Sequence, residues 1–126
     1  MTIVSFSRQM KYSLEAAEKL QAEHGVSAEV INLRSIRPLD RETIINSVKK
    51  TNRIVSVEDG WPQSGVGSEI AAVLMETSAF DHLDAPFARV TGADAPMAYA
   101  RNLELASSPD TEKIGQAALP ALGGTF

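Results

Sequence analysis

The stretch RIVSVEDGWPQSGVGSEIAAVLM, residues 53–75, decides the fold class of this chain. It opens with residues 53–57, an apolar run rich in Val and Ile that predicts a buried strand. A loop with Gly and Pro follows over residues 58–67, and apolar side chains then recur at helical spacing from about residue 66 to residue 78. A strand followed by a loop and an amphipathic helix is half of a β-α-β unit, from which parallel sheets are built.

The same alternation of strand and helix continues on both sides of this stretch. Further strands are predicted over residues 2–6, 26–33 and 87–91, and further helices over residues 7–24, 40–50 and 108–120. Because β-α-β connections are right-handed, the helices should cover both faces of the sheet. We therefore expect one domain over residues 1–126, an α/β fold in three α/β/α layers with a mostly parallel sheet of four to five strands.

Small polar residues mark where the predicted helices begin. Ser7, Asp40 and Ser108 each stand at a position suited to an N-cap, and Pro109 after Ser108 suits the first turn of a helix. In the first helix, helical spacing predicts that the buried side chains are those of Met10, Leu14 and Ala17. Residues 92–107 are expected to form a loop with one helical turn, and residues 120–126 a flexible tail.

The composition restricts the kinds of site and partner that the chain can have. The chain has 126 residues, of which 44% are apolar and 22% charged, with a net charge of −4 and no cysteine. The absence of cysteine excludes disulfides, thiolate zinc sites and cysteine nucleophiles, and the acidic balance argues against a nucleic-acid partner. No apolar run is long enough to span a membrane. Strand-like sequence begins directly after Met1, so we expect a piece of a longer protein.

Two motifs in the 58–67 loop could carry chemistry. Gly65-Val66-Gly67 could hold an anion at a helix N-terminus, although it lacks the third glycine of a dinucleotide motif and also suits a tight turn. Glu58 and Asp59 could form an acid–base pair. Adjacent residues at a strand end point to opposite faces, however, so a carboxylate that accepts hydrogen bonds from backbone amides is the simpler interpretation.

The remaining candidates are single side chains. His24 and His82 stand far apart in the sequence without the carboxylates of a metal site, which favours surface histidines. Arg34 and Arg37 could bind a phosphate or a carboxylate, or pair with acidic residues of a neighbouring subunit. Trp61, the only tryptophan, lies in a loop beside a proline and suits either packing on its own domain or contact with another. These residues favour a binding or assembly module over a complete enzyme.

Three motifs resemble the transketolase C-terminal domain family. Residues 32–40, NLRSIRPLD, resemble the loop after the second strand in beta subunits of 2-oxo acid dehydrogenases. Residues 58–70, EDGWPQSGVGSEI, are most similar to the mitochondrial-type beta subunits of pyruvate dehydrogenase, because branched-chain relatives usually lack the GWPQ run. Residues 90–100, VTGADAPMAYA, are a third match, and the resemblance extends over residues 2–119.

The resemblance implies an α₂β₂ parent oxidoreductase in a multienzyme complex of acetyl-CoA biosynthesis. This enzyme decarboxylates pyruvate with thiamine diphosphate and magnesium and acetylates the lipoyl group of the acetyltransferase. The family's cofactor lies between the alpha subunit and an N-terminal beta domain that would precede Met1. The resemblance therefore assigns this chain no catalytic, cofactor-binding or metal-binding residue, predicts that it is inactive alone, and places the parent in the mitochondrial matrix.

The family role of this domain is contact with the alpha subunit and the second beta subunit, and docking to the subunit-binding domain of dihydrolipoyl acetyltransferase. Trp61 is a candidate partner contact from its place in the loop, and the resemblance implies partner-binding roles for Asp84 and for the terminal carboxylate at Phe126. Asp84 also suits a turn before a proline, Ala98 replaces a proline common in the family, and the tail over residues 119–126 departs from the family pattern. The alternatives are a stand-alone small-ligand-binding α/β module and the same domain of another thiamine-dependent enzyme.

Overall fold

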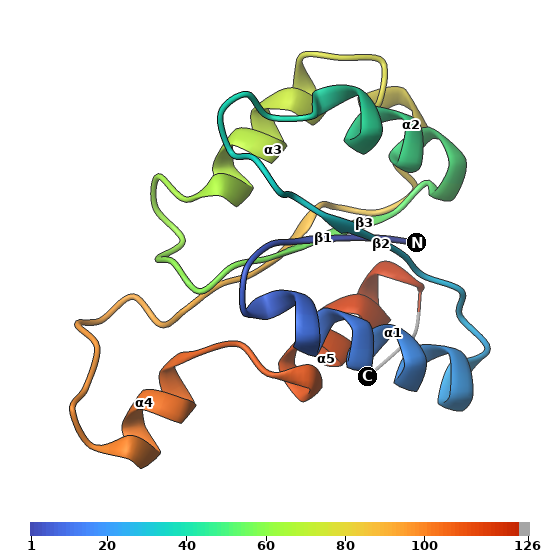
Figure 1. Ribbon diagram of the computed structural model, residues 1–126. Coiled ribbons are helices and arrows are strands. Elements are labelled where there is room, and N and C mark those ends of the chain that lie inside the picture. Colours follow the sequence, from blue (N-terminus) through green and yellow to red (C-terminus); the bar gives the residue numbers. More distant parts are fainter. Residues whose placement is uncertain (124–126) are drawn as a thin grey trace.

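The computed structural model describes residues 1–123 and contains a sheet of four parallel strands in the order β2-β1-β3-β4 (Figure 1). The central pair is in register with Ile3 opposite Val55, and Ile3 also lies opposite Val30 of the neighbouring edge strand. The predicted α/β class with a parallel sheet is confirmed, with four strands among the described residues. The strand bounds are β1 Thr2–Ser5, β2 Glu29–Asn32, β3 Ile54–Val57 and β4 Ala88–Val90.

Helices cover both faces of this sheet, as the alternation of elements predicts (Figure 1). One face is covered by α1 (Gln9–His24) and α5 (Thr111–Ala121), and the other by α2 (Arg41–Thr51) and α3 (Val66–Met75). Successive strand residues point to opposite faces, so the core forms two layers. Ile3, Val55, Val57 and Val90 face α1 and α5, whereas Val4, Ile31 and Ile54 lie in the other layer.

The N-cap of α2 is the one that the sequence located correctly. Asp40 accepts a hydrogen bond from the Thr43 backbone N–H at 3.1 Å and another from the Thr43 hydroxyl at 2.7 Å. These two hydrogen bonds favour the charged carboxylate, so they lower the pKa of Asp40.

The other two predicted caps are wrong. Ser7 adopts a left-handed conformation with φ of 54° in the turn before α1. The last helix, α5, begins at Thr111, and its cap is Asp110, whose carboxylate accepts the Lys113 backbone N–H at 2.8 Å. Ser108 instead lies buried before the helix. At its other end α5 continues to Ala121, one residue past the predicted end at Pro120.

The buried face of α1 also differs from the prediction. Leu14 is 50% exposed, whereas the helix buries Gln9, Ser13, Ala16 and Leu20. The prediction failed because it ranked side chains by hydrophobicity. The small Ser13 and Ala16 side chains lie on the buried face of the helix, and Gln9 is buried because its amide has polar partners in the 58–67 loop and before α5.

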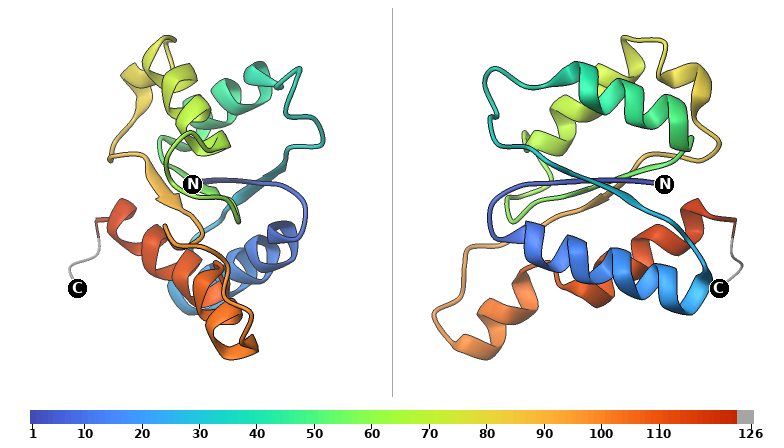
Figure 2. Two further views of the ribbon diagram at one scale, coloured as in Figure 1. Left: turned by 90° about the vertical axis from the view of Figure 1, so that its left-hand side faces the viewer. Right: turned by 45° about the vertical axis from the view of Figure 1, so that its right-hand side comes forward.

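Residues 92–107 contain more structure than the single turn that we expected. They include α4, Arg101–Ser107, none of whose residues is buried. This helix projects from the rest of the domain beyond the carboxyl ends of the strands (Figure 2). A short 3₁₀ helix, η1 (Phe80–His82), lies in the connection between α3 and β4.

A buried carboxylate joins β3 to α3. Glu58 follows directly after β3, is 3% exposed, and accepts the backbone N–H groups of Val66 at 2.8 Å and Gly67 at 3.1 Å. An Arg89 guanidinium nitrogen from β4 lies 3.7 Å from the same carboxylate. The Glu58 side chain thus caps α3 and compensates the positive end of the helix dipole.

Replacing Glu58 with Gln tests this cap. The amide keeps the shape, but it removes the charge and places N–H donors where the helix amides and Arg89 need an acceptor. We expect the free energy of unfolding to fall by about 2–3 kcal/mol, measured by urea denaturation. Glu18→Gln, the same exchange at an exposed site on α1, is the control. Equal effects in the two variants would contradict the cap.

Two glycines offer a matched pair of alanine substitutions. A Cβ at Gly65 would lie 2.6 Å from a Glu58 carboxylate oxygen and 2.8 Å from the Trp61 carbonyl, whereas a Cβ at Gly115 in α5 meets no atom within 4 Å. Gly65→Ala should therefore lower the free energy of unfolding by about 1–3 kcal/mol. Gly115→Ala should raise it by about 0.5–1 kcal/mol, because alanine favours the helix. Thermal and urea melts of both variants check the opposite signs.

Candidate functional site

The loops at the carboxyl ends of β3 and β4 lie against each other. The Gly92 backbone N–H donates to the Gly60 carbonyl at 2.9 Å, and the Trp61 indole N–H donates to the Ala95 carbonyl at 3.1 Å. Trp61 is nevertheless 56% exposed, so its ring faces outward from this pair of loops. The sequence left open whether Trp61 packs on its own domain, and the structure places it at the surface.

Glu58 and Asp59 point to opposite faces, so they do not form an acid–base pair. Asp59 accepts hydrogen bonds from the Arg8 guanidinium at 3.0 Å and from the Gln9 amide at 2.6 Å, and its hydrogen bond with Arg8 raises the pKa of that arginine. Sequence reasoning missed Arg8 and Gln9 as partners of this loop. The sequence gives no sign that a polar residue at the start of α1 is buried, because its partner Asp59 lies about fifty residues away and is brought beside it only by the fold.

The helix N-terminus at Gly65-Val66-Gly67 is occupied by the protein itself. The two amide groups that could hold a ligand anion already donate to Glu58, and a Cβ at either glycine would overlap the Glu58 carboxylate or its neighbours. A second anion would repel this carboxylate. The turn interpretation is therefore correct, and the site does not fit a diphosphate group.

The histidines form no common site. His82 Nδ1 lies 2.9 Å from the Ser78 carbonyl, and His24 Nε2 lies 3.9 Å from a Glu23 oxygen. Within residues 1–123, no three His, Asp or Glu side chains are close enough to hold a metal ion. No helix in the same part of the chain is long and apolar enough to cross a membrane.

Arg34 and Arg37 are both exposed in the loop after β2, and neither makes an ion pair with a described residue. Among the described residues, neither arginine forms a hydrogen bond with the loop that contains Trp61.

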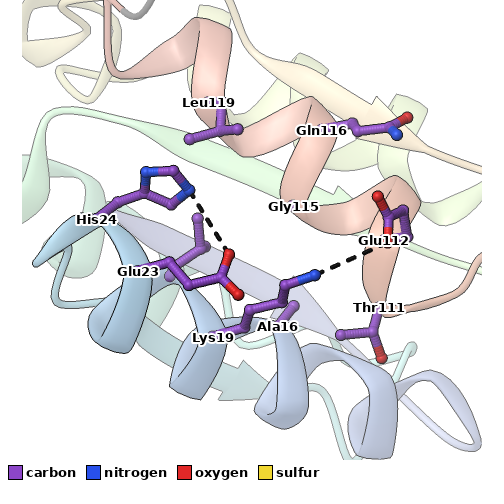
Figure 3. A pocket seen from close by; sticks show the side chains of 10 residues that line it. Ala16, Lys19, Glu23, His24, Thr111, Glu112, Gly115, Gln116 and Leu119 are labelled. Carbon is purple, nitrogen blue, oxygen red and sulfur yellow. Dashed lines mark ion pairs between the residues drawn. The ribbon is translucent and has the colours of Figure 1, made fainter.

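A small gap between α1 and α5 is shown in Figure 3. Its volume is about 110 Å³, and it opens where Gly115 of α5 has no side chain. Lys19 reaches across it to Glu112 at 3.8 Å, and Glu23 lies 3.9 Å from His24 (Figure 3). Because the Lys19 ammonium pairs with the Glu112 carboxylate across it, the gap is a packing space between two helices and not a polar ligand site.

Asp84 lies at the rim of a larger, mostly apolar hollow. Its side chain is exposed, and its backbone N–H donates to the Asn52 carbonyl at 2.9 Å. The hollow measures about 620 Å³ and lies between α3 and the connection to β4. It is lined by Ala71, Leu74, Met75, Phe80, Asp81, Leu83, Asp84, Ala85, Pro86 and Phe87. Phe126, the third expected partner-binding residue, lies outside the described residues.

Further large apolar side chains are exposed at Trp61 and over residues 97–105, which include part of α4. We define the α4 surface as the exposed side chains of Trp61, Met97, Tyr99, Leu103 and Leu105. Most of the stability of a helix in a protein comes from packing of its apolar side, and a helix of seven residues is too short to be stable alone. Within the described domain, Leu103 and Leu105 of this helix are left uncovered.

Comparison with known proteins gives close relatives. The chain is 60% identical over 118 residues to the pyruvate dehydrogenase E1 component subunit beta, mitochondrial, of Dictyostelium discoideum, covering 94% of this chain and 33% of that protein. It is 58% identical over 114 residues to the Homo sapiens protein of the same name, covering 90% and 32%. The chain thus spans about a third of the length of these relatives.

A solved structure and a family model agree with this relationship. The chain matches a split-gene transketolase, described as an inactive beta4 tetramer, with a TM-score of 0.81 and 30% identity, covering 97% of this chain and 38% of the other. The family model "Transketolase, C-terminal domain" matches residues 1–114. The resemblance seen in the sequence motifs is confirmed, and this chain belongs to the transketolase C-terminal domain family.

Proposed function

We propose that this chain is the C-terminal assembly and docking domain of a mitochondrial-type pyruvate dehydrogenase beta subunit. The parent enzyme would decarboxylate pyruvate and acetylate the lipoyl group of dihydrolipoyl acetyltransferase in the mitochondrial matrix. Identity of about 60% with relatives of that name supports the parent. The observation that carries the assembly role is the α4 surface, because its apolar side chains lack cover within the described domain.

Catalysis would reside outside this chain. The helix N-terminus most suited to a diphosphate is closed by Glu58, and the described carboxylates and histidines do not converge as metal ligands do. We therefore place the thiamine diphosphate and magnesium of the parent enzyme on its other parts. This domain would contribute the contacts that hold those parts together.

Two surfaces would divide the assembly and docking roles. The α4 surface would meet the alpha subunit or the second beta subunit, since aromatic side chains and Met are enriched in such interfaces. Asp84 would meet a basic surface of the acetyltransferase's subunit-binding domain, with Phe126 as a second contact through the terminal carboxylate. Asp84 suits this role because its carboxylate is exposed and makes no ion pair with a described residue.

The fluorescence of Trp61 tests the assembly role. The chain has one tryptophan, so its emission reports a single site. In the isolated chain we expect red-shifted emission that iodide quenches readily, because the ring is largely exposed. In the assembled parent enzyme, with all other tryptophans replaced by phenylalanine, the Trp61 emission should shift to the blue and resist iodide. Equal quenching in both states would place the subunit contact elsewhere.

Replacing Asp84 with Asn tests the docking role. The exchange keeps the shape and removes the charge, so titration with the acetyltransferase's subunit-binding domain should show about tenfold weaker binding at low salt, or ~1.4 kcal/mol. The difference should shrink at high salt, because ions screen exposed charges. Glu18→Gln, at an exposed glutamate on α1, is the control. Unchanged affinity at low salt would mean that Asp84 is only a turn residue.

A further inference from the structure

We infer that the docking partner inserts an apolar side chain into the hollow beside Asp84, while cationic groups on either side of that side chain meet Asp81 and Asp84. This inference rests on the proposed docking role and adds the apolar contact. It identifies the partner by its chemistry: a basic protein surface from which one large apolar residue projects.

The lining of the hollow supports an apolar occupant. Leu74 of α3 is fully buried and forms part of its lining, and Ala71 leaves room on the same helix. Met75 is 64% exposed and Phe80 is 51% exposed, so two large apolar side chains remain in contact with water at its edge. Covering these side chains removes apolar surface from water, which is the main favourable term in association. An ordinary salt bridge to Asp84 would leave this surface uncovered.

The charges around the hollow select a cationic partner. Asp81 and Asp84 are exposed, and no ion pair involves either within residues 1–123. No lysine or arginine lines the hollow. The nearby carboxylate of Glu76 is paired with Arg41 at 3.4 Å, so the two aspartates carry the unpaired negative charge. A partner with positive groups that face both aspartates gains both attraction and a faster association rate.

The same charges argue against a second copy of this chain as the occupant. Two copies meeting through this face by a two-fold axis would bring the same surface of each together. Asp81 and Asp84 of both copies would then face each other, and the chain already carries a net charge of −4. A basic partner avoids this repulsion.

Filling the hollow tests the inference. Ala71→Leu adds apolar volume toward the hollow, keeps both aspartates and suits the helix. We expect it to weaken binding of the acetyltransferase's subunit-binding domain at least tenfold, and equally at low and high salt, because the lost contact is apolar. Ala22→Leu, the same exchange at an exposed alanine of α1 on the opposite face of the sheet, should leave binding unchanged.

A second variant covers the case in which Ala71→Leu fails to fold. Met75→Gln changes an exposed side chain at the edge of the hollow, so the fold should tolerate it. We expect about threefold to tenfold weaker binding that does not depend on salt, with thermal melts confirming that the chain is folded. This salt-independent loss contrasts with the salt-dependent loss expected for Asp84→Asn.

The outcomes separate this inference from the proposed function. If Asp84→Asn weakens binding while Ala71→Leu and Met75→Gln do not, docking stands and the apolar insertion is rejected. If none of the three variants changes the affinity, docking lies elsewhere on the chain and both proposals fail. A salt-independent loss in the two apolar variants, together with a salt-dependent loss in Asp84→Asn, supports both.

Discussion

The buried carboxylate of Glu58 is the constraint on which the loop at the carboxyl edge of the sheet depends. Burying a charge is unfavourable unless it is hydrogen-bonded and paired. Here the carboxylate accepts two backbone N–H groups of α3 and lies 3.7 Å from an Arg89 nitrogen. These contacts tie the end of β3, the start of α3 and the middle of β4 together. They also explain the glycines at 65 and 67, since any Cβ there would occupy the space of the Glu58 carboxylate or its neighbours.

In this domain the helix N-terminus, a geometry that often binds a ligand anion, holds a carboxylate of the protein itself and so stabilises the fold. Helix N-termini after a glycine turn attract anions because their free N–H groups point outward. Here the anion is the side chain of Glu58, the residue directly after β3. The next residue, Asp59, points the other way and holds the start of α1 through Arg8 and Gln9. The two adjacent carboxylates therefore fasten helices on opposite faces of the sheet, and the loop that follows them presents Trp61 to the surface.

The two surfaces proposed for partners differ in how the fold produces them. The α4 surface arises because a seven-residue helix extends beyond the strand ends and packs little against the domain (Figure 2). The hollow near Asp84 lies against the body of the domain, between α3 and the connection to β4. One is a projection that suits a large covering surface, and the other is a depression that suits a single inserted side chain. If both proposals hold, their different shapes would let one small domain contact different partners.

The sequence by itself determined the order of strands and helices, the parallel sheet, the cap at Asp40 and the family. These follow from local patterns: runs of β-branched residues, helical spacing, an Asp before a helix, and motifs such as EDGWPQ. Even the opposite directions of Glu58 and Asp59 follow from the alternation along a strand. Only the tertiary structure decided which face of α1 is buried, where α5 begins and that residues 101–107 form a helix. The burial of Gln9 and of Ser108 depends on groups far apart in the chain: Gln9 is buried because Asp59 and the Pro109 carbonyl accept its amide N–H groups, and Ser108 is buried where Arg8 reaches it. Hydrophobic spacing ranks side chains one at a time, whereas burial of a polar side chain is decided by the partner that the fold brings to it.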